Sequence, residues 1–390
     1  MTTKYAEILL PQKIHGLSAS LTYEIPSVNS ESYKPGQIVE IPLRNRQTRG
    51  LLFKIHQNPP NFKTKPITRI IPGEISLSIE QLELIDHISE YYFCPPHKVL
   101  KLFLPSTIFS RKRDFIASPA KDKKINTIPQ LQLTDEQIKA LEKIKKSDKS
   151  TILLHGVTGS GKTEIYRRLT TEILASDQQA LILVPEISLT PQTVKNFQDR
   201  FGDKIAIVHS RLTAKQKINY LHQINSGEIK ILVGSRSAIF APFHNLGVII
   251  IDEEHEDSYK QDQSPRYHVR EIAQKICSMA NQHGKQIKLI LGSATPSIES
   301  YQQAINGIYD LVKLTKRIEN SGANSNLPPI HLVDLRQEIK KKNFSIFSEI
   351  LQTKISETLQ RKEQVILFLN RRGAASAVIC RDCGYTETCP

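Results

Sequence analysis

The sequence is short of the features that mark membrane and secreted proteins. None of its apolar runs approaches the roughly 20 residues that span a bilayer, and its N-terminus, Met-Thr-Thr-Lys-Tyr-Ala-Glu, lacks the apolar core and cleavage site of a signal peptide. These absences predict a cytoplasmic protein without a membrane partner. Cysteine is scarce too. Cys94 and Cys277 stand alone, which is typical of small buried hydrophobic positions, so we assign them no chemical role.

Acidic residues are also scarce relative to basic ones. Against 53 lysines and arginines, the 390 residues contain only 39 aspartates and glutamates, which gives a formal net charge of +14. The excess favours a polyanionic partner, most simply nucleic acid, although a genome-wide preference for lysine would produce the same balance. Two basic clusters add to the nucleic-acid interpretation: Arg111–Arg113 followed by Lys121, Lys123 and Lys124, and the run Lys340–Lys342.

Two patterns divide the chain. Residues 1–105 contain short strand-like runs separated by proline and glycine, and a helical stretch around Ser78–Tyr92, which predicts a small β-rich domain. Residues 106–132 are basic, polar and weakly patterned, which predicts a linker. From Leu133 onward, short apolar runs alternate with helical stretches, as in a parallel sheet covered on both faces; the runs are Ile152–Leu154, Leu181–Val184, Ile205–Val208, Ile231–Val233, Val248–Ile251 and Leu289–Leu291.

The alternation is interrupted at residues 318–330, which predicts a joint between domains, and one more buried strand is expected at Val365–Leu369. The sequence therefore predicts an α/β protein. Residues 133–325 form its main lobe, and residues 326–390 begin a second one.

A glycine-rich segment, GVTGSGKT at residues 156–163, lies between a predicted strand and a predicted helix. Glycines let backbone N–H groups surround phosphates, and the helix that follows points its positive end at them. In this pattern the lysine reaches the β/γ-phosphates and the threonine hydroxyl binds Mg²⁺. The predicted nucleotide-binding residues are Gly156, Val157, Thr158, Gly159, Ser160, Gly161, Lys162 and Thr163.

A second acidic element follows another apolar strand. Val248–Ile251 runs directly into Asp252-Glu253-Glu254-His255. A charged run is often a solvated face, but a buried strand would carry this one to the carboxyl edge of the sheet, where ligands bind in open α/β folds. We expect Asp252 to coordinate Mg²⁺ and Glu253 to orient the attacking water, which makes Lys162, Asp252 and Glu253 the predicted catalytic residues.

The tetrad Asp252–His255, together with Gly-Ser-Ala-Thr-Pro at residues 292–296, resembles the superfamily 2 helicases. These are P-loop motors with a RecA-like parallel sheet. The resemblance implies that residues 292–296 couple hydrolysis to movement along a nucleic-acid strand. Residues 133–137 are similar to the family's adenine-reading segment, which places Gln137 on the base.

Three longer strings resemble the primosomal replication-restart helicases within that superfamily: LVPEISLTPQ at residues 183–192, VGSRSAIFAPF at 233–243 and FLNRRG at 368–373. Residues 257–270 are similar to the family's aromatic-rich loop, which senses single-stranded DNA. Its tyrosines suit stacking on unpaired bases and its cations suit phosphate, although tyrosines packed against a helix edge are the alternative. The implied DNA-side residues are Arg236, Tyr259, Lys260, Arg266, Tyr267 and Arg270.

The N-terminal segment resembles the family's domain that captures the 3′ end of a nascent strand. The residues that carry this likeness are Tyr23–Pro26, Lys34–Gly36 and Tyr91-Tyr92 before Pro95-Pro96. The resemblance implies a terminus-binding pocket at Leu21, Thr22 and Gly36. Some relatives carry an aromatic-acid pair where Leu-Thr stands here, and strand packing and a turn are an alternative role for Tyr23 and Gly36.

The chain also departs from that family. Residues 106–132 are too few for the winged-helix domain of many relatives, so we expect only a basic tether there. Cys380, Cys383 and Cys389 resemble the start of a zinc-binding insertion, but zinc sites of this kind take four ligands and three are present. In the family, the second lobe supplies arginines that stabilise charge on the γ-phosphate, and we do not find them here. We therefore expect a truncated chain that binds Mg²⁺-ATP and forked DNA with weak turnover.

The resemblance as a whole implies an ATP-dependent 3′→5′ DNA helicase that recognises stalled or abandoned replication forks and starts primosome assembly. Its cofactors are ATP and Mg²⁺, with Zn²⁺ implied for a longer form. Implied partners are forked and single-stranded DNA, helicase-loading proteins and single-stranded DNA-binding protein. Two alternatives stay open: a fork-binding or primosome scaffold without productive ATPase activity, and a translocase on double-stranded DNA.

Overall fold

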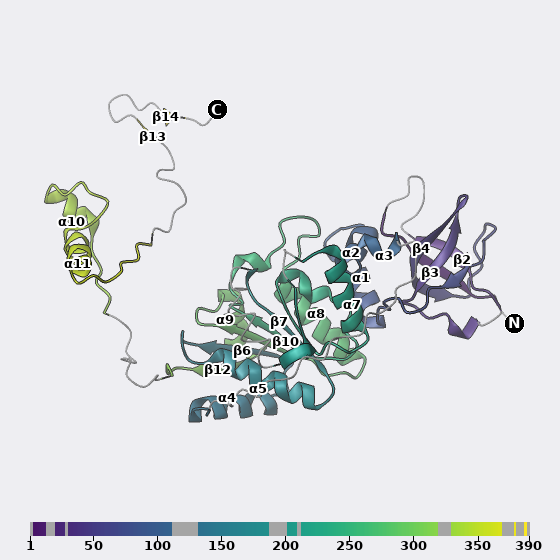
Figure 1. Ribbon diagram of the computed structural model, residues 1–390, viewed down its shortest axis with the longest axis horizontal. Coiled ribbons are helices and arrows are strands. Elements are labelled where there is room, and N and C mark those ends of the chain that lie inside the picture. Colours follow the sequence, from purple (N-terminus) through teal and green to yellow (C-terminus); the bar gives the residue numbers. More distant parts are fainter. Residues whose placement is uncertain are drawn as a thin grey trace. The chain divides into compact units, whose positions relative to one another are not determined.

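The computed structural model describes residues 3–12, 20–27, 30–110, 132–186, 201–208, 212–318, 329–368, 378–379 and 386–387. The chain forms two compact units, residues 1–323 and 324–390 (Figure 1). The first unit holds an antiparallel sheet and a larger parallel sheet.

The N-terminal sheet is antiparallel, in the strand order β2-β1-β4-β3-β5. Alternate residues of its strands point to opposite faces. One face, with Ile8 and Val39, belongs to the domain's own core. The other, with Leu9 and Leu51, joins a core that extends into the parallel sheet. The strands are β1 Tyr5–Leu9, β2 Ser20–Glu24, β3 Ile38–Leu43, β4 Arg46–His56 and β5 Arg69–Ile70.

Three helices connect this sheet to the rest of the unit: α1 Ile79–Tyr91, α2 Pro96–Phe103 and α3 Ser106–Phe109. The first begins with a capping box in which Ser78 and Gln81 exchange hydrogen bonds with each other's backbone N–H. The linker predicted from residue 106 begins too early, because Ile108 and Phe109 of α3 are buried in the core. Residues 111–131 lie outside the described residues.

The parallel sheet has seven strands in the order β12-β6-β11-β10-β7-β9-β8. It confirms the predicted α/β class, and the six predicted apolar runs all lie in or at its strands. Sequence reasoning missed the edge strand β12. The strands are β6 Thr151–Gly156, β7 Gln179–Leu183, β8 Ile205–Val208, β9 Ile231–Gly234, β10 Leu246–Asp252, β11 Lys288–Ser293 and β12 Asp310–Leu314.

Helices cover both faces of this sheet (Figure 1). Residues of α4 Asp135–Lys146 and α5 Lys162–Ala175 share one core with alternate strand residues such as Ile152 and Ile250. The intervening residues, such as Leu153 and Ile251, pack on the other side with α7 Ala214–Asn225, α8 Val269–Gln282 and α9 Ile298–Ile305. Burial on both faces explains why the strands are continuously apolar.

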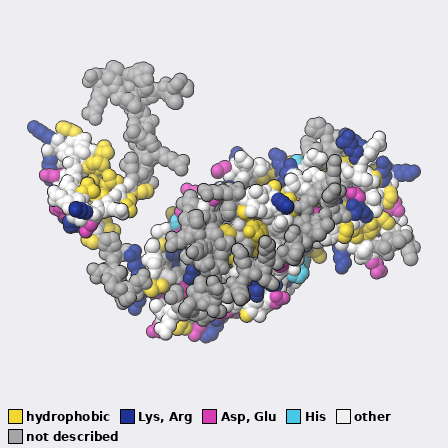
Figure 2. All heavy atoms as spheres, in the orientation of Figure 1, with side chains coloured by type: hydrophobic (Ala, Val, Ile, Leu, Met, Phe, Trp, Pro, Cys, Tyr) yellow, Lys and Arg dark blue, Asp and Glu magenta, His cyan; other side chains and the backbone are white. Residues whose placement is uncertain are grey.

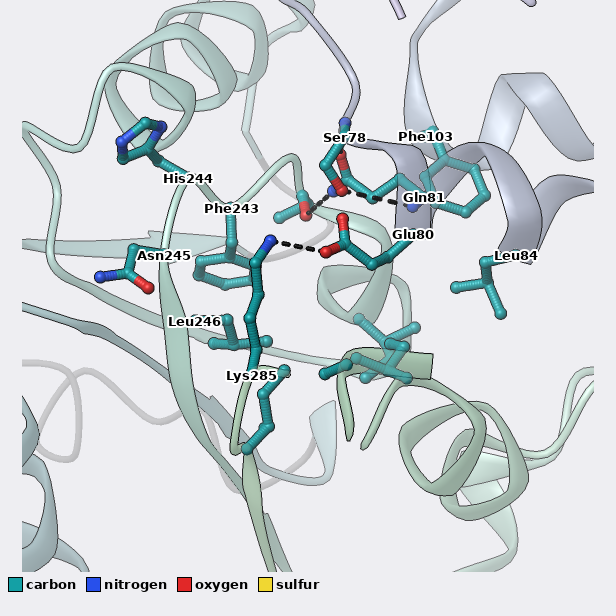
Figure 3. Close-up of a pocket in the computed structure, with 15 residues that line it drawn as sticks. Ser78, Glu80, Gln81, Leu84, Phe103, Phe243, His244, Asn245, Leu246 and Lys285 are labelled. Atoms are coloured by element: carbon teal, nitrogen blue, oxygen red, sulfur yellow. Dashed lines mark hydrogen bonds and ion pairs between the residues drawn. The ribbon is translucent and has the colours of Figure 1, made fainter. Parts of the chain in front are cut away.

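The helix α1 is fastened to the parallel-sheet lobe by polar contacts around a mainly apolar cavity of about 80 Å³ (Figure 3). Gln81 Nε2 donates to the Ala241 carbonyl at 3.2 Å, and Lys285 Nζ lies 2.5 Å from Glu80 Oε1. On its far end, the Tyr92 hydroxyl donates to Glu271 Oε2 at 2.7 Å. These contacts fix α1 against residues that follow β9 and β10 in the chain.

We expect the Glu80–Lys285 pair to make the stability of this junction pH-dependent. Burial alone would raise the pKa of Glu80, but hydrogen bonds from Lys285 and Ser78 outweigh it and lower the pKa to about 2. The stabilisation is therefore complete above pH 4.5, the group's ordinary pKa, and is lost as the pH falls toward 2. Glu80→Gln should destabilise the protein by about 1 kcal/mol at pH 7, since solvent screens the pair.

Thermal unfolding of wild type and Glu80→Gln at several pH values between 7 and about 3 measures this difference. The difference should shrink as the solution is acidified. A gap between the two proteins that stays constant across the series would contradict the assignment.

The second unit contains α10 Leu335–Lys340, α11 Glu349–Gln360 and a pair of two-residue strands, β13 Val378–Ile379 and β14 Thr386–Glu387. The strand predicted at Val365–Leu369 is wrong over its described residues: 365–368 form none, and Ile366 and Phe368 are largely exposed. A parallel strand needs neighbouring strands on which to bond, and the described part of this unit offers it no such sheet. Figure 2 shows hydrophobic side chains gathered on the surface around α10 and α11.

Candidate nucleotide site

The glycine-rich segment forms the turn between β6 and α5. Gly159 and Gly161 have φ values of +79° and +81°, in the left-handed region that glycine adopts without strain. Gly161 is the N-cap of α5, so the first N–H groups of the helix have no partner within the helix and face the turn. This is the local geometry of a phosphate-binding helix N-terminus.

The turn encloses a cavity of about 530 Å³, which is lined by Gln132, Gln137, Thr158, Gly159, Ser160, Gly161, Lys162, Thr163, Glu164, Asp252, Glu253 and Ile318. Lys162 is buried and donates from Nζ to the Gly156 carbonyl at 2.9 Å. Ser160 Oγ is buried and has no hydrogen-bond partner within the described residues. A cationic side chain and a free hydroxyl in a turn of open N–H groups fit a polyphosphate.

Asp252 ends β10 two strands away from β6, with β11 between them. The register places Asp252 beside Gly292 and Gly292 beside Leu154, so Asp252 lies level with a residue of β6 that comes two positions before the glycine-rich segment. Asp252 is mostly buried, and burial raises the pKa of its carboxyl group. A carboxylate and the Thr163 hydroxyl on one cavity are oxygen ligands of the type that Mg²⁺ prefers.

Two tyrosines hold Asp252 in place. The Tyr166 hydroxyl on α5 donates to Asp252 Oδ1 at 2.9 Å, and the Tyr259 hydroxyl donates to the Asp252 carbonyl at 2.7 Å. Burial and the neighbouring carboxylate raise the pKa of both phenols, so both stay neutral donors. Sequence reasoning missed Tyr166, whose only signal was its position four residues after Lys162, one helical turn along α5.

The two glutamates after Asp252 differ sharply. Glu253 is partly exposed, lines the cavity and has a φ of +46°, which is uncommon for a residue with a side chain. Glu254 is completely buried and accepts hydrogen bonds from Arg270 Nη1, Ser297 and Ser300. Only Glu253 is therefore placed to meet a ligand in the cavity, while Glu254 ties the strand end to the N-termini of α8 and α9.

A segment after β12 completes the cavity wall, and sequence reasoning missed it as well. Val157 N donates to the Leu314 carbonyl at 3.0 Å, and Ile318 N donates to the Gly159 carbonyl at 2.9 Å. Gln137 lies behind the turn, where its Nε2 donates to the Ser160 carbonyl at 3.0 Å and its Oε1 accepts from Thr134 N. Gln137 lines the cavity, and the base-reading role stays a prediction.

The loop between β10 and α8 was predicted to face DNA, and the structure divides its residues into two groups. The rings of Tyr259 and Tyr267 are only 1% and 2% exposed, and Tyr267 packs edge-on against Phe240. The predicted stacking of these two rings on bases is therefore corrected: they are core residues. Lys260 and Arg266 are exposed. Arg236 donates to the carbonyls of Ser258 and Lys260, which fixes the loop from the η4 turn, Arg236–Phe240.

The predicted 3′-end pocket lies on the antiparallel sheet. Leu21 on β2 pairs with Ile8, which pairs with Leu52, and Gly36 N donates to the Leu52 carbonyl at 2.7 Å. Leu21, Thr22 and Gly36 therefore lie near one row across three strands. Gly36 also has a packing reason to be glycine, because its φ is +94° and a Cβ would lie 1.9 Å from the Leu77 carbonyl oxygen. Whether these residues bind a terminus stays a prediction.

Other predicted features fall elsewhere. Cys380, Cys383 and Cys389 lie outside the described residues, as does most of the string at 183–192. Within the described ranges no group of three or more histidine, cysteine, aspartate or glutamate side chains is arranged to hold a metal. The helices seen in those ranges include none with the length and apolar character to cross a membrane.

Known proteins share both parts of the first unit. Residues 134–304 match the family model described as DEAD/DEAH box helicase, and residues 7–105 match the 3′ DNA-binding domain model of PriA. The parallel sheet, its glycine-rich turn and the carboxylate at the end of β10 thus define the P-loop lobe of a superfamily 2 helicase.

Curated relatives identify the family more closely. A replication restart protein PriA from Bacillus subtilis is 48% identical over 276 residues, covering 70% of this chain and 33% of the relative. The PriA of Rickettsia felis is 38% identical over 387 residues, covering 99% of this chain and 56% of the relative. The chain belongs to the PriA family, and it spans a third to about half of the length of these relatives.

One solved structure, of RecG bound to a three-way DNA junction, is similar over 51% of this chain and 25% of that chain. The sequence identity is 24% and the TM-score is 0.37.

Proposed function

We propose that this chain is the nucleotide-binding and fork-binding part of an ATP-dependent 3′→5′ DNA helicase that restarts replication. The observation that carries the proposal is the single cavity on which Lys162, Thr163, Asp252 and Glu253 meet. In this arrangement the turn and Lys162 bind the phosphates, and Glu253 orients a water for attack. Mg²⁺, when bound by Thr163 and Asp252, would neutralise charge on the transferred phosphoryl group.

The N-terminal domain supplies the second half of the proposal. Its likeness to a 3′ DNA-binding domain supports capture of a 3′ end at a fork by residues 1–105, with the P-loop lobe at residues 133–325. Forked DNA is then the substrate, and the proteins that assemble a primosome are the proposed partners. Zinc binding by Cys380, Cys383 and Cys389 is part of this proposal only for a longer form that supplies a fourth ligand, and these three residues lie outside the described ones.

ATP hydrolysis with and without a forked DNA tests the proposed function. We expect the wild-type chain to bind a fluorescent ATP analogue in the presence of Mg²⁺, and Lys162→Ala to weaken that binding about tenfold or more by removing the charge on the phosphates. DNA should stimulate ATP hydrolysis by the wild type and should not stimulate ATP hydrolysis by Lys162→Ala. Fork binding without nucleotide binding by the wild type would instead favour a scaffold without ATPase activity.

A further inference from the structure

The C-terminal end of α1 carries an unusual turn. Phe93 N donates to the Glu90 carbonyl at 3.3 Å and Cys94 N donates to the Ser89 carbonyl at 2.9 Å, which is the hydrogen-bond pair of a Schellman motif. The residue after the helix cap in this motif adopts a left-handed backbone, and Phe93 has a φ of +48°. Glycine or asparagine normally occupies that position because a bulky side chain is strained there.

The side chain at this strained position gains nothing from the fold. Phe93 is 95% exposed, so its ring buries almost no apolar surface against the protein. The turn itself has a clear structural purpose, since it returns Cys94 to the core, where it is 2% exposed. Glycine would serve that purpose without strain and without an exposed ring. A phenylalanine that both strains the backbone and exposes its ring to water points to a function for the ring.

A second exposed ring lies two residues before the first in sequence and packs against its neighbours. Tyr91 is 62% exposed, stacks on His87 with ring centroids 5.6 Å apart, and meets Tyr92 edge-on at 4.8 Å. Tyr92 is in turn anchored to α8 through its hydroxyl on Glu271. Tyr91 therefore offers an exposed aromatic ring that is supported by two neighbouring rings.

The turn also touches the cationic loop. Ser264 Oγ donates to Cys94 Sγ at 3.5 Å, which places the residue next to Phe93 against the loop between β10 and α8. That loop exposes Lys260 and Arg266, while its own tyrosines are buried. Cations for phosphates and aromatic faces for bases are thus supplied by two neighbouring segments from different parts of the chain.

We propose that Tyr91 and Phe93 form a base-stacking site for single-stranded DNA, with the phosphates of the same strand on Lys260 and Arg266. The site rests on the proposed function as a DNA motor, and adds to it a contact at the junction of the two sheets. Stacking on exposed aromatic rings is insensitive to sequence because every base has a flat face. The site should therefore bind unpaired strands of any composition and should not bind duplex.

Phe93→Gly separates the ring's role in binding from its role in folding. We expect this variant to keep or raise the melting temperature, because glycine relieves the strained backbone. The same variant should bind a labelled single-stranded oligothymidine about fivefold or more weakly in fluorescence anisotropy, since one stacking contact is lost. Phe93→Tyr, which keeps an aromatic face, should retain the wild-type affinity.

Phe62→Ala is the matched control, because Phe62 is also an exposed phenylalanine of this unit but stands in a sequence with no neighbouring aromatic ring. Its affinity should equal that of the wild type. If Phe93→Gly binds the oligonucleotide as tightly as Phe62→Ala does, the stacking site is refuted and the exposed rings serve some other contact, such as a protein partner. If the wild type itself binds no single-stranded DNA, the proposed function fails rather than this site alone.

Discussion

Replacing Glu254 by alanine should destabilise the first unit by about 3–5 kcal/mol, which is a large part of the stability of an ordinary domain. The side chain of Glu254 is completely buried, and its oxygens accept from Arg270 Nη1 at 2.9 Å, Ser297 N at 2.7 Å and Ser300 Oγ at 2.9 Å. Alanine would leave the guanidinium of Arg270, itself mostly buried, without its principal counter-charge.

The position of Glu254 relative to two helices adds to this cost. Ser297 is the N-cap of α9, and Arg270 lies in the first turn of α8. A carboxylate between two helix N-termini interacts favourably with both helix dipoles, and Glu254 also accepts from the backbone N–H of the α9 N-cap, Ser297. Glu254→Gln keeps the shape and loses the charge, so it should cost less, on the order of 1–3 kcal/mol.

Urea denaturation followed by far-UV circular dichroism measures both values, a suitable probe because the chain has no tryptophan. Glu253→Gln is the matched control: it changes the adjacent carboxylate, which is partly exposed, and should alter stability by less than about 0.5 kcal/mol. An alanine variant at Glu254 that is as stable as this control would show that Arg270 finds another partner, and the assignment of Glu254 as a structural residue would fall.

The contrast between these two glutamates shows where sequence reasoning ends. An apolar strand followed by Asp-Glu-Glu-His predicts acidic groups at the edge of a parallel sheet, and that prediction rests on strand periodicity and on the geometry common to α/β folds. Which of the acidic side chains turns inward depends on residues 270, 297 and 300, which fold onto the strand end from two later helices. No local pattern contains that information.

Aromatic residues show the same limit of prediction from the sequence. The loop with Tyr259 and Tyr267 was predicted to present its rings to DNA because it resembles the family's aromatic-rich loop, and tyrosines beside lysine and arginine suit that role. The structure buries both rings, one on the Asp252 carbonyl and the other on Phe240. Exposure depends on the tertiary structure. The sequence alone therefore does not show that these two rings are buried, whereas Tyr91 and Phe93, about 170 residues earlier in the chain, are exposed.

The strands illustrate the role of context. Val248–Ile251 and Leu289–Leu291 are buried strands because each finds partners on both sides in the sheet. Residues 365–368 have the same apolar character and form no strand, and the sheet in the described part of the second unit is a two-residue antiparallel pair, β13 and β14, that they do not join. Apolar composition predicts that a segment can enter a sheet. Only neighbouring strands decide that it does.

The second large effect is expected at Gly292, on the strand between the glycine-rich turn and Asp252. A Cβ at this position would lie 1.7 Å from the Tyr166 hydroxyl oxygen and 2.8 Å from the ring carbon that bears it. Tyr166 is fully buried and has little room to retreat. Gly292→Ala should therefore force the phenol away from Asp252, with a loss of about 2–3 kcal/mol in stability from overpacking.

The displaced phenol should also weaken Mg²⁺ binding, because the Tyr166 hydroxyl holds the Asp252 carboxylate from the side. Tyr166→Phe removes only that hydrogen bond, so it should cost about 1 kcal/mol in stability and raise the Mg²⁺ concentration needed for binding of an ATP analogue severalfold. Nucleotide affinity measured without Mg²⁺ should hardly change in Tyr166→Phe, since Lys162 and the turn are untouched.

The double variant decides whether the two residues act through one contact. If Gly292→Ala is harmful because its methyl group meets the phenol oxygen, then removing that oxygen with Tyr166→Phe should recover part of the lost stability, and the two effects should be less than additive. Strictly additive losses in urea denaturation would mean that Gly292 and Tyr166 matter for separate reasons. In the coupled case, glycine at residue 292 is required because the hydroxyl that positions the Asp252 carboxylate occupies the space where any larger side chain would begin.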